Sequence, residues 1–304
     1  MLRRLLMVAL FLAVWFAGDR ALAYLAGAFL DRSHEPIAEL YGDRGVAGVV
    51  LLGNSRAYRS FDLGLVSREF GGKVLNLALP GSSMELSEAL LEDYIDRYGA
   101  PHVLVVELSE LMGDPDPLKN MRPFLSRSQR LSLLVKEHFP KLYYAGLVSH
   151  LFNYNSDFAL NAAHKVLYPM PDLALEGSLS ESEIAAITPG SYFVPHAREI
   201  GAAQRLIETV RRNNIDTRFV LAPVVREYAE ANDIAALRRA VGDLTAGFQV
   251  WDLAENPPME PRYFVDQNHL NREGVGIFMQ ALRERGFFAS PARLGRVPDE
   301  DHLN

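Results

Sequence analysis

Five short runs rich in apolar and β-branched residues recur along this chain, and stretches with helical spacing of apolar residues separate them. Continuous apolar runs of this length suit strands that are buried on both faces, as in a parallel sheet covered by helices. The pattern predicts a three-layer α/β/α fold around a mostly parallel five-stranded sheet. The predicted strands are residues 47–52, 73–78, 103–108, 218–222 and 248–253. The predicted helices are residues 63–70, 84–98, 197–213, 234–244 and 271–285.

One long segment, from about residue 110 to 195, interrupts this alternation. It is rich in aromatic residues and histidine, and it ends in a stretch rich in Gly, Pro and Ser. Because the strands on either side belong to one predicted sheet, we interpret the segment as a mostly helical insertion that covers the site. The expected organisation is a juncture over residues 31–45, a main domain over 46–290 that contains the insertion, and a polar tail over 291–304.

An apolar run, residues 5–18, stands near the N-terminus behind Arg3 and Arg4. Basic residues before an apolar run favour a start that stays cytoplasmic while the rest of the chain is exported. A second apolar stretch follows Asp19 and Arg20 and keeps helical spacing without a proline. We therefore predict a single-pass signal-anchor helix, with the remaining chain on the outer face of the cytoplasmic membrane.

The same segment also permits a cleaved signal peptide. The run 5–18 alone is shorter than the roughly 20 residues that span a bilayer. The triplet Ala21-Leu22-Ala23 resembles a signal-peptidase site. We favour an anchor over residues 1–30, and cleavage after Ala23 stays open as the alternative.

Charge and composition exclude several kinds of partner and site. The 31 basic and 38 acidic residues give a formal charge of −7, and no basic cluster could follow a phosphate backbone, so we expect no nucleic-acid partner. Cysteine is absent, which rules out a thiol nucleophile and thiolate metal sites. The histidines show no close-spaced ligand motif, and we expect neither a metal nor another cofactor.

The first predicted strand runs directly into Gly53-Asn54-Ser55-Arg56. A serine just past a strand, after a glycine that permits a tight turn, can present its hydroxyl at the edge of the sheet beside free backbone N–H groups. Turns after strands are also rich in Gly, Asn and Ser for conformational reasons, so the motif alone is a weak signal. It makes Ser55 a candidate nucleophile.

The second predicted strand is followed by Pro80-Gly81-Ser82-Ser83. A glycine beyond the neighbouring strand can bring its N–H close to a serine at the end of the first strand, which is the geometry that an oxyanion hole requires. Ser82 or Ser83 is also suited to cap the helix that follows. These two interpretations are compatible.

Asp266 and His269 stand immediately before the last predicted helix, for which Asn271 is a suitable N-cap. A spacing of three lets the carboxylate accept a hydrogen bond from the imidazole Nδ1–H and direct Nε2 toward a serine. Such a pair is equally common as an ordinary surface pair. Its combination with the Ser55 turn is far more specific than either part.

The set order of these motifs, from the Ser55 turn through Gly81 to Asp266 and His269, resembles the SGNH (GDSL-like) hydrolase superfamily over about residues 46–286. The motifs look most like its membrane-anchored bacterial branch, which includes exopolysaccharide and teichoic-acid acylation proteins. The resemblance implies Ser55 as nucleophile, His269 as base and Asp266 as its orienter. It also implies the backbone N–H groups of Ser55 and Gly81 as oxyanion donors.

The chain departs from that superfamily after the third strand. Ser109-Glu110-Leu111 stands where the superfamily has an asparagine that supplies the third oxyanion donor. Losing one donor costs about 10²–10³ in rate if nothing replaces it. Asn54 or Ser109 is a possible substitute.

Two further residues are candidates for substrate binding. Arg56 suits an anionic or carbohydrate acceptor, although an exposed arginine near a strand end is common. Tyr58 belongs to a group of aromatic residues that could form a wall for stacking sugars or could equally belong to the core. The other members of that group are Tyr192, Phe193, Tyr263 and Phe264.

The preferred function is an envelope polysaccharide O-acyltransferase or esterase that acts through an acyl-Ser55 intermediate. We expect it to need no cofactor and to work with a multi-span membrane acyltransferase partner. Two alternatives stay open. The first is a free-standing secreted carboxylesterase or lipase, which a cleaved signal peptide would favour. The second is a catalytically weak glycan-binding scaffold subunit of an export complex, which the missing third donor would favour.

Overall fold

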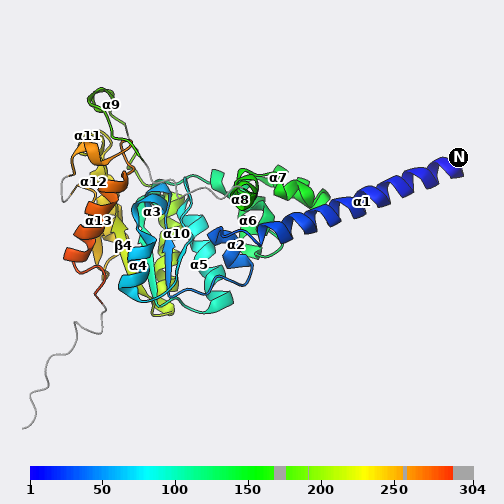
Figure 1. Ribbon diagram of the computed structural model, residues 1–304, viewed down its shortest axis with the longest axis horizontal. Coiled ribbons are helices and arrows are strands. Elements are labelled where there is room, and N and C mark those ends of the chain that lie inside the picture. Colours follow the sequence, from blue (N-terminus) through cyan, green and yellow to red (C-terminus); the bar gives the residue numbers. More distant parts are fainter. Residues whose placement is uncertain (168–175, 191, 256–258, 290–304) are drawn as a thin grey trace, which may run out of the picture.

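The computed structural model describes residues 1–167, 176–190, 192–255 and 259–289. The predicted polar tail lies outside these residues. The described chain forms a five-stranded, all-parallel sheet flanked by helices, with an apolar helix at the N-terminus (Figure 1). The prediction of a three-layer α/β/α fold is therefore confirmed.

The sheet has the strand order β2-β1-β3-β4-β5. Its strands are β1 (Val49–Leu52), β2 (Val74–Asn76), β3 (Val103–Glu107), β4 (Asp216–Leu221) and β5 (Val250–Asp252). All neighbouring strands pair in parallel. The order reverses between β1 and β3, and the carboxyl ends of strands at such a switch point are where open α/β sheets place their sites.

Helices cover both faces of the sheet, and strand residues alternate between the two layers because successive side chains point to opposite faces. In β1, Val50 and Leu52 pack in the core with α5, α10 and α12, whereas Val49 and Leu51 pack in the core with α3, α4 and α13. The helices around the sheet are α2 (Pro36–Tyr41), α3 (Ser55–Ser60), α4 (Leu63–Phe70), α5 (Met84–Tyr98), α10 (Ala197–Arg212), α11 (Arg226–Ala231), α12 (Ile234–Leu244) and α13 (Arg272–Glu284).

The N-terminal helix α1 (Leu2–Leu30) projects away from the body of the molecule (Figure 1). Its 29 residues are long and apolar enough to cross a membrane, a property that signal sequences share. Its first part is exposed, and only residues from Asp19 onward have buried side chains.

The insertion between β3 and α10 consists of short helices. They are η1 (Leu108–Met112), η2 (Asp116–Phe124), α6 (Gln129–His138), α7 (Pro140–Val148), η3 (Leu151–Tyr154), α8 (Asp157–Leu167) and α9 (Glu181–Ala185). We refer to η2, α6, α7, η3 and α8 as the collar, because they pack around the C-terminal part of α1 (Figure 1).

Both ends of the insertion come near the predicted site residues. The collar contacts α1 and α5, and a Cβ at Gly81 would lie 3.4 Å from the Pro117 side chain of η2. After the collar, Leu179 N–H donates to the Phe264 carbonyl at 2.8 Å. That the insertion covers the site stays a prediction. A short 3-10 helix, η4 (Pro261–Tyr263), leads from β5 into the loop that carries Asp266 and His269.

Candidate active site

Ser55, His269 and Asp266 form one hydrogen-bonded chain in the structure. The Ser55 Oγ lies 2.7 Å from His269 Nε2, and His269 Nδ1 lies 2.8 Å from Asp266 Oδ2. An ionised carboxylate only accepts hydrogen bonds, so Nδ1 carries the proton and donates it to Asp266. Nε2 of the neutral ring then accepts from the Ser55 hydroxyl, which is the arrangement a general base needs.

The turn after β1 positions Ser55 at the first residue of α3. Gly53 has φ +148, which side-chain-bearing residues rarely adopt, and a Cβ there would lie 2.4 Å from Ala57 Cβ and 3.0 Å from Glu107 Cβ. The Asn54 side chain accepts from Arg56 N–H at 2.9 Å and caps α3. The glycine and the cap together let the strand end turn into a helix that begins at the nucleophile.

The loop before α13 holds Asp266 and His269. Asp266 Oδ1 accepts the N–H groups of Asn268 and His269, both at 3.0 Å, and this fixes the carboxylate against its own loop. Burial favours the neutral acid, but the hydrogen bonds from the imidazole and from these N–H groups outweigh it and lower the pKa of Asp266 below its usual value. Asn271 accepts from Gly274 N–H and caps α13, as the sequence predicts.

The oxyanion candidates occupy neighbouring chain segments. Leu79 N–H donates to the Gly53 carbonyl at 3.0 Å, which extends the pairing of β1 and β2 to within two residues of both Ser55 and Gly81. Gly81 is exposed with φ +75. The first N–H groups of a helix have no acceptor within it, so the Ser55 N–H is suited to receive an oxyanion.

The two proposed substitutes for the third donor differ in what they already bind. Ser109 donates its hydroxyl and its N–H to Glu107 Oε2, which engages its polar hydrogens inside the protein. Asn54 uses its side-chain oxygen to cap α3. Its amide group is therefore the better placed of the two for this role.

Arg56 is buried below the Ser55 turn, which does not fit the expectation that it binds an acceptor. Its side chain is 1 % exposed and donates to the carbonyls of Ala222 and Pro223. Its Nη1 lies 3.7 Å from Glu107 Oε1, and Glu107 also accepts from Ala222 N–H at 3.2 Å. This charge pair links the turn after β1 to the ends of β3 and β4.

Glu107 and Tyr228 are residues of the site region that the sequence analysis did not single out. The rings of Tyr228 and Tyr192 are 5.5 Å apart, and Tyr192 Oη accepts from Asn268 in the triad loop at 3.4 Å. Burial and the neighbouring Tyr192 raise the pKa of Tyr228 to about 12, so its hydroxyl stays neutral. These two tyrosines form an aromatic wall beside the loop.

The remaining aromatic candidates separate into core and surface. Phe193 and Phe264 are fully buried and belong to the core. Tyr58 and Tyr192 are 37 % and 40 % exposed, and Tyr58 lies one helical turn after Ser55. Tyr263 is half-buried, and its hydroxyl accepts from the Arg262 guanidinium at 2.6 Å. Tyr58 and Tyr192 are therefore the most exposed residues of this group.

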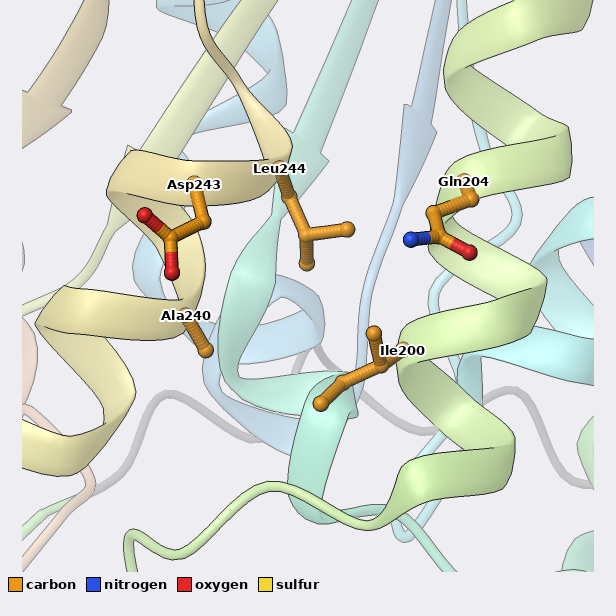
Figure 2. Close-up of a pocket in the computed structure, with 5 residues that line it drawn as sticks. All are labelled: Ile200, Gln204, Ala240, Asp243 and Leu244. Carbon is orange, nitrogen blue, oxygen red and sulfur yellow. The ribbon is translucent and has the colours of Figure 1, made fainter.

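Two hollows of the molecular surface lie away from the triad. One, of about 330 Å³, is lined by Ile200 and Gln204 of α10 and by Ala240, Asp243 and Leu244 of α12. Leu244 points toward Gln204 and Ile200 across the space between the two helices (Figure 2). The other, of about 470 Å³, lies between α1 and the collar. Within the described part of the chain, no group of three or more His, Asp or Glu side chains is placed to hold a metal ion.

Comparisons with known proteins give weak likenesses. No family model and no curated protein sequence matches the chain. A solved structure from Streptococcus pneumonia, provisionally named a platelet activating factor, is 13% identical, covers 92% of this chain and 98% of its own, and has a TM-score of 0.38. A provisionally named acylhydrolase from Bacteroides fragilis is 12% identical over 78% of this chain and 85% of its own, with a TM-score of 0.39. Scores of this size carry no argument about chemistry, which rests on the site geometry.

Proposed function

We propose that this chain is a serine-dependent enzyme that cleaves acyl esters and passes the acyl group to water or to a second hydroxyl. The observation that carries the proposal is the hydrogen-bonded chain from Ser55 Oγ through His269 to Asp266, with 2.7 Å and 2.8 Å between the paired atoms. It joins groups that are separated by 214 positions in the sequence.

The proposed reaction has two steps. His269 Nε2 takes the proton of Ser55 as Oγ attacks the ester carbonyl, and the N–H groups of Ser55 and Gly81 stabilise the oxyanion. His269 then gives that proton to the departing alcohol, which leaves an acyl-Ser55. A second hydroxyl gives its proton to His269 and attacks this ester. The bond between the acyl carbon and Ser55 Oγ then breaks, the acyl group stays on the second hydroxyl oxygen, and His269 returns the proton to Ser55.

The finer proposal is an O-acyltransferase or esterase of an envelope polysaccharide, held at the outer face of the cytoplasmic membrane and working with a multi-span acyltransferase partner. Contacts in the C-terminal part of α1 support the proposal that this helix is not cleaved off. Asp19 accepts from Ser149 Oγ at 2.5 Å and from the N–H groups of His150 and Leu151 at 2.8 and 3.3 Å. Cleavage after Ala23 would remove Asp19 and leave these collar donors without it.

The test of the ester chemistry is covalent labelling and turnover. A fluorophosphonate probe should label the wild type at Ser55 and not the Ser55→Ala variant. Hydrolysis of a chromogenic acetyl ester should fall about 10⁴-fold or more in Ser55→Ala and in His269→Ala, because triad members act as a unit. Ser67→Ala is a matched control. It also removes one serine hydroxyl, which donates to the Gly72 carbonyl at 2.8 Å and is not part of the proposed triad. Wild-type turnover in Ser55→Ala would end the serine-enzyme proposal.

A second measurement separates transfer from hydrolysis. The full chain in membranes receives a chromogenic acetyl ester, and acetylated oligosaccharide and free acetate are both quantified as the oligosaccharide concentration rises. Positioning a sugar hydroxyl in place of bulk water can lower the barrier by several kcal/mol, so a transferase should shift its product toward acetylated sugar. The same titration after co-expression with the membrane partner is the control. Acetate as the sole product under both conditions would contradict the transferase proposal and leave an esterase.

A further inference from the structure

The edge of the collar formed by α7 and η3 exposes a cluster of apolar side chains. Tyr144 and Leu147 are each 54 % exposed, Val148 is 64 % exposed and Leu151 is 36 % exposed. Large apolar side chains gathered on one edge of a protein mark contact with a protein or a membrane. The stretch of residues 140–154 contains no acidic residue and includes Lys141.

This edge sits at the point where the exposed apolar part of α1 ends. Arg20 Nη1 donates to the Val148 carbonyl at 3.0 Å, and the Arg20 guanidinium lies 3.8 Å from the centre of the Phe16 ring. Asp19 accepts from the N–H of Leu151 at 3.3 Å. The collar edge is therefore level with the first charged pair that follows the apolar run.

We propose that the α7–η3 edge lies in the interfacial region of the same bilayer that α1 crosses, so that the molecule has a second, monotopic contact with the membrane. This inference rests on the membrane-anchored location proposed above. In Figure 1, α7 lies alongside α1 and reaches farther along it than the other helices of the body. Leu147, Val148 and Leu151 would enter the boundary between headgroups and acyl chains.

Four features favour lipid as the occupant of this edge. The edge continues directly from α1, so a bilayer that contains the run 5–18 must come close to it. Tyrosine side chains such as Tyr144 are enriched at membrane interfaces. Lys141 can place its charge at the headgroups while its stem covers apolar surface. The absence of acidic residues from 140–154 suits the negative surface of anionic lipids.

A second membrane contact has a consequence for the site. With α1 as the single membrane contact, the helix and the body attached to it can tilt and rotate together in the bilayer, whereas two contacts fix their orientation. The triad would then be held at a constant height and direction above the outer leaflet. Such a placement suits an enzyme that takes its acyl group from a partner embedded in the same membrane.

The chain contains no cysteine, so single nitroxide labels can be introduced without background. The full chain carrying Val148→Cys or Leu147→Cys is labelled and reconstituted into vesicles of phosphatidylethanolamine and phosphatidylglycerol. Collision rates with oxygen, which concentrates in lipid, and with a water-soluble nickel chelate are then measured. Val46→Cys is the matched control, because Val46 is 66 % exposed, close to the 64 % of Val148, and stands before β1, outside both α1 and the collar. Leu10→Cys reports on the anchor itself.

We expect the ratio of the oxygen collision rate to the nickel-chelate collision rate to be several-fold higher at positions 148 and 147 than at position 46. At position 10 this ratio should be higher still. A ratio at 148 and 147 equal to that at 46, with position 10 in lipid, would overturn the second contact while the anchor stands. Low rates for both reagents at 148 and 147 would show a protein neighbour and would also overturn it. An aqueous ratio at position 10 would instead overturn the membrane-anchored location.

Discussion

The role proposed for Asp266 depends on the charge that this carboxylate keeps next to His269. The carboxylate is 43 % exposed and His269 is 16 % exposed, so the pair lies at the border between solvent and protein. The lowered pKa of Asp266 means that it stays ionised throughout the neutral range. A charged acceptor at Nδ1 holds the imidazole in the tautomer whose Nε2 is free to take the Ser55 proton.

Replacing Asp266 with asparagine should lower kcat by about 10⁴-fold, because an amide can donate to Nδ1 and stabilise the wrong tautomer. The variant should also lose stability at neutral pH. A group with a lowered folded pKa contributes stability above its unfolded pKa and loses it as the pH falls through the folded pKa. The difference in Tm between the two proteins should therefore be present at pH 7 and shrink in strong acid. A constant difference at both pH values would contradict this role.

The hydrogen-bonded arrangement of Ser55, His269 and Asp266 could be predicted from the sequence, and its surroundings could not. Gly53, Ser55 and the Asp266–His269 pair each stand in a short motif next to a predicted strand or helix. The burial of Arg56 depends on Glu107 and on the carbonyls after β4, which come from distant parts of the chain. A charge is buried only where such partners meet, and no local pattern records that.

At the level of elements, α5 and α10 pack with acidic side chains between them. Glu199 of α10 is 2 % exposed, and its carboxylate accepts from Glu85 N–H at 3.2 Å. Burial, reinforced by the charge of Glu85, raises the pKa of Glu199 from 4.5 to about 7. The interface between these helices therefore carries a proton at mildly acidic pH.

The free energy of unfolding should fall as the pH rises from about 4.5 to about 7. A group whose pKa is raised in the folded protein contributes its full stability below the unfolded pKa, and this contribution is lost as the pH rises through the folded pKa. Glu199→Gln keeps an acceptor for Glu85 N–H and has no proton to lose, so its Tm should change less over this range. Thermal unfolding at pH 5 and pH 8 measures the effect. Glu208→Gln, on the exposed side of the same helix, should retain the wild-type change. An unaltered pH dependence in Glu199→Gln would refute the assignment.

The helices α4, α5 and α12 were easier to predict than α3 and the collar helices. The predictions for residues 63–70, 84–98 and 234–244 match the bounds of α4, α5 and α12, because each has apolar spacing over two or more turns. The six-residue α3 was not predicted, since it is too short to show a period and depends on the Asn54 cap. The collar helices were predicted only as helical, because their place beside α1 depends on long-range contacts such as Arg127 with Asp31.

At the scale of the whole molecule, the part of α1 from Asp19 to Leu30 packs against the body. The Arg127 guanidinium pairs with both oxygens of the Asp31 carboxylate, and the Tyr154 ring packs close to Gly27. These contacts connect the C-terminal part of α1 to the collar. The N-terminal part, with its exposed apolar side chains, projects from the body and is available to lipid.

The orientation across the membrane should follow from Arg3 and Arg4, because basic residues flanking an apolar helix are retained on the cytoplasmic side. A cysteine introduced at Val46 should then react with a membrane-impermeant maleimide in spheroplasts. A cysteine at Leu2 should react only after the membrane is opened. Replacing both arginines with acidic residues should reverse or scramble this pattern if their charge sets the orientation. Equal labelling at both positions in intact spheroplasts would contradict the topology, and a mature chain that lacks Leu2 would identify α1 as a cleaved signal sequence.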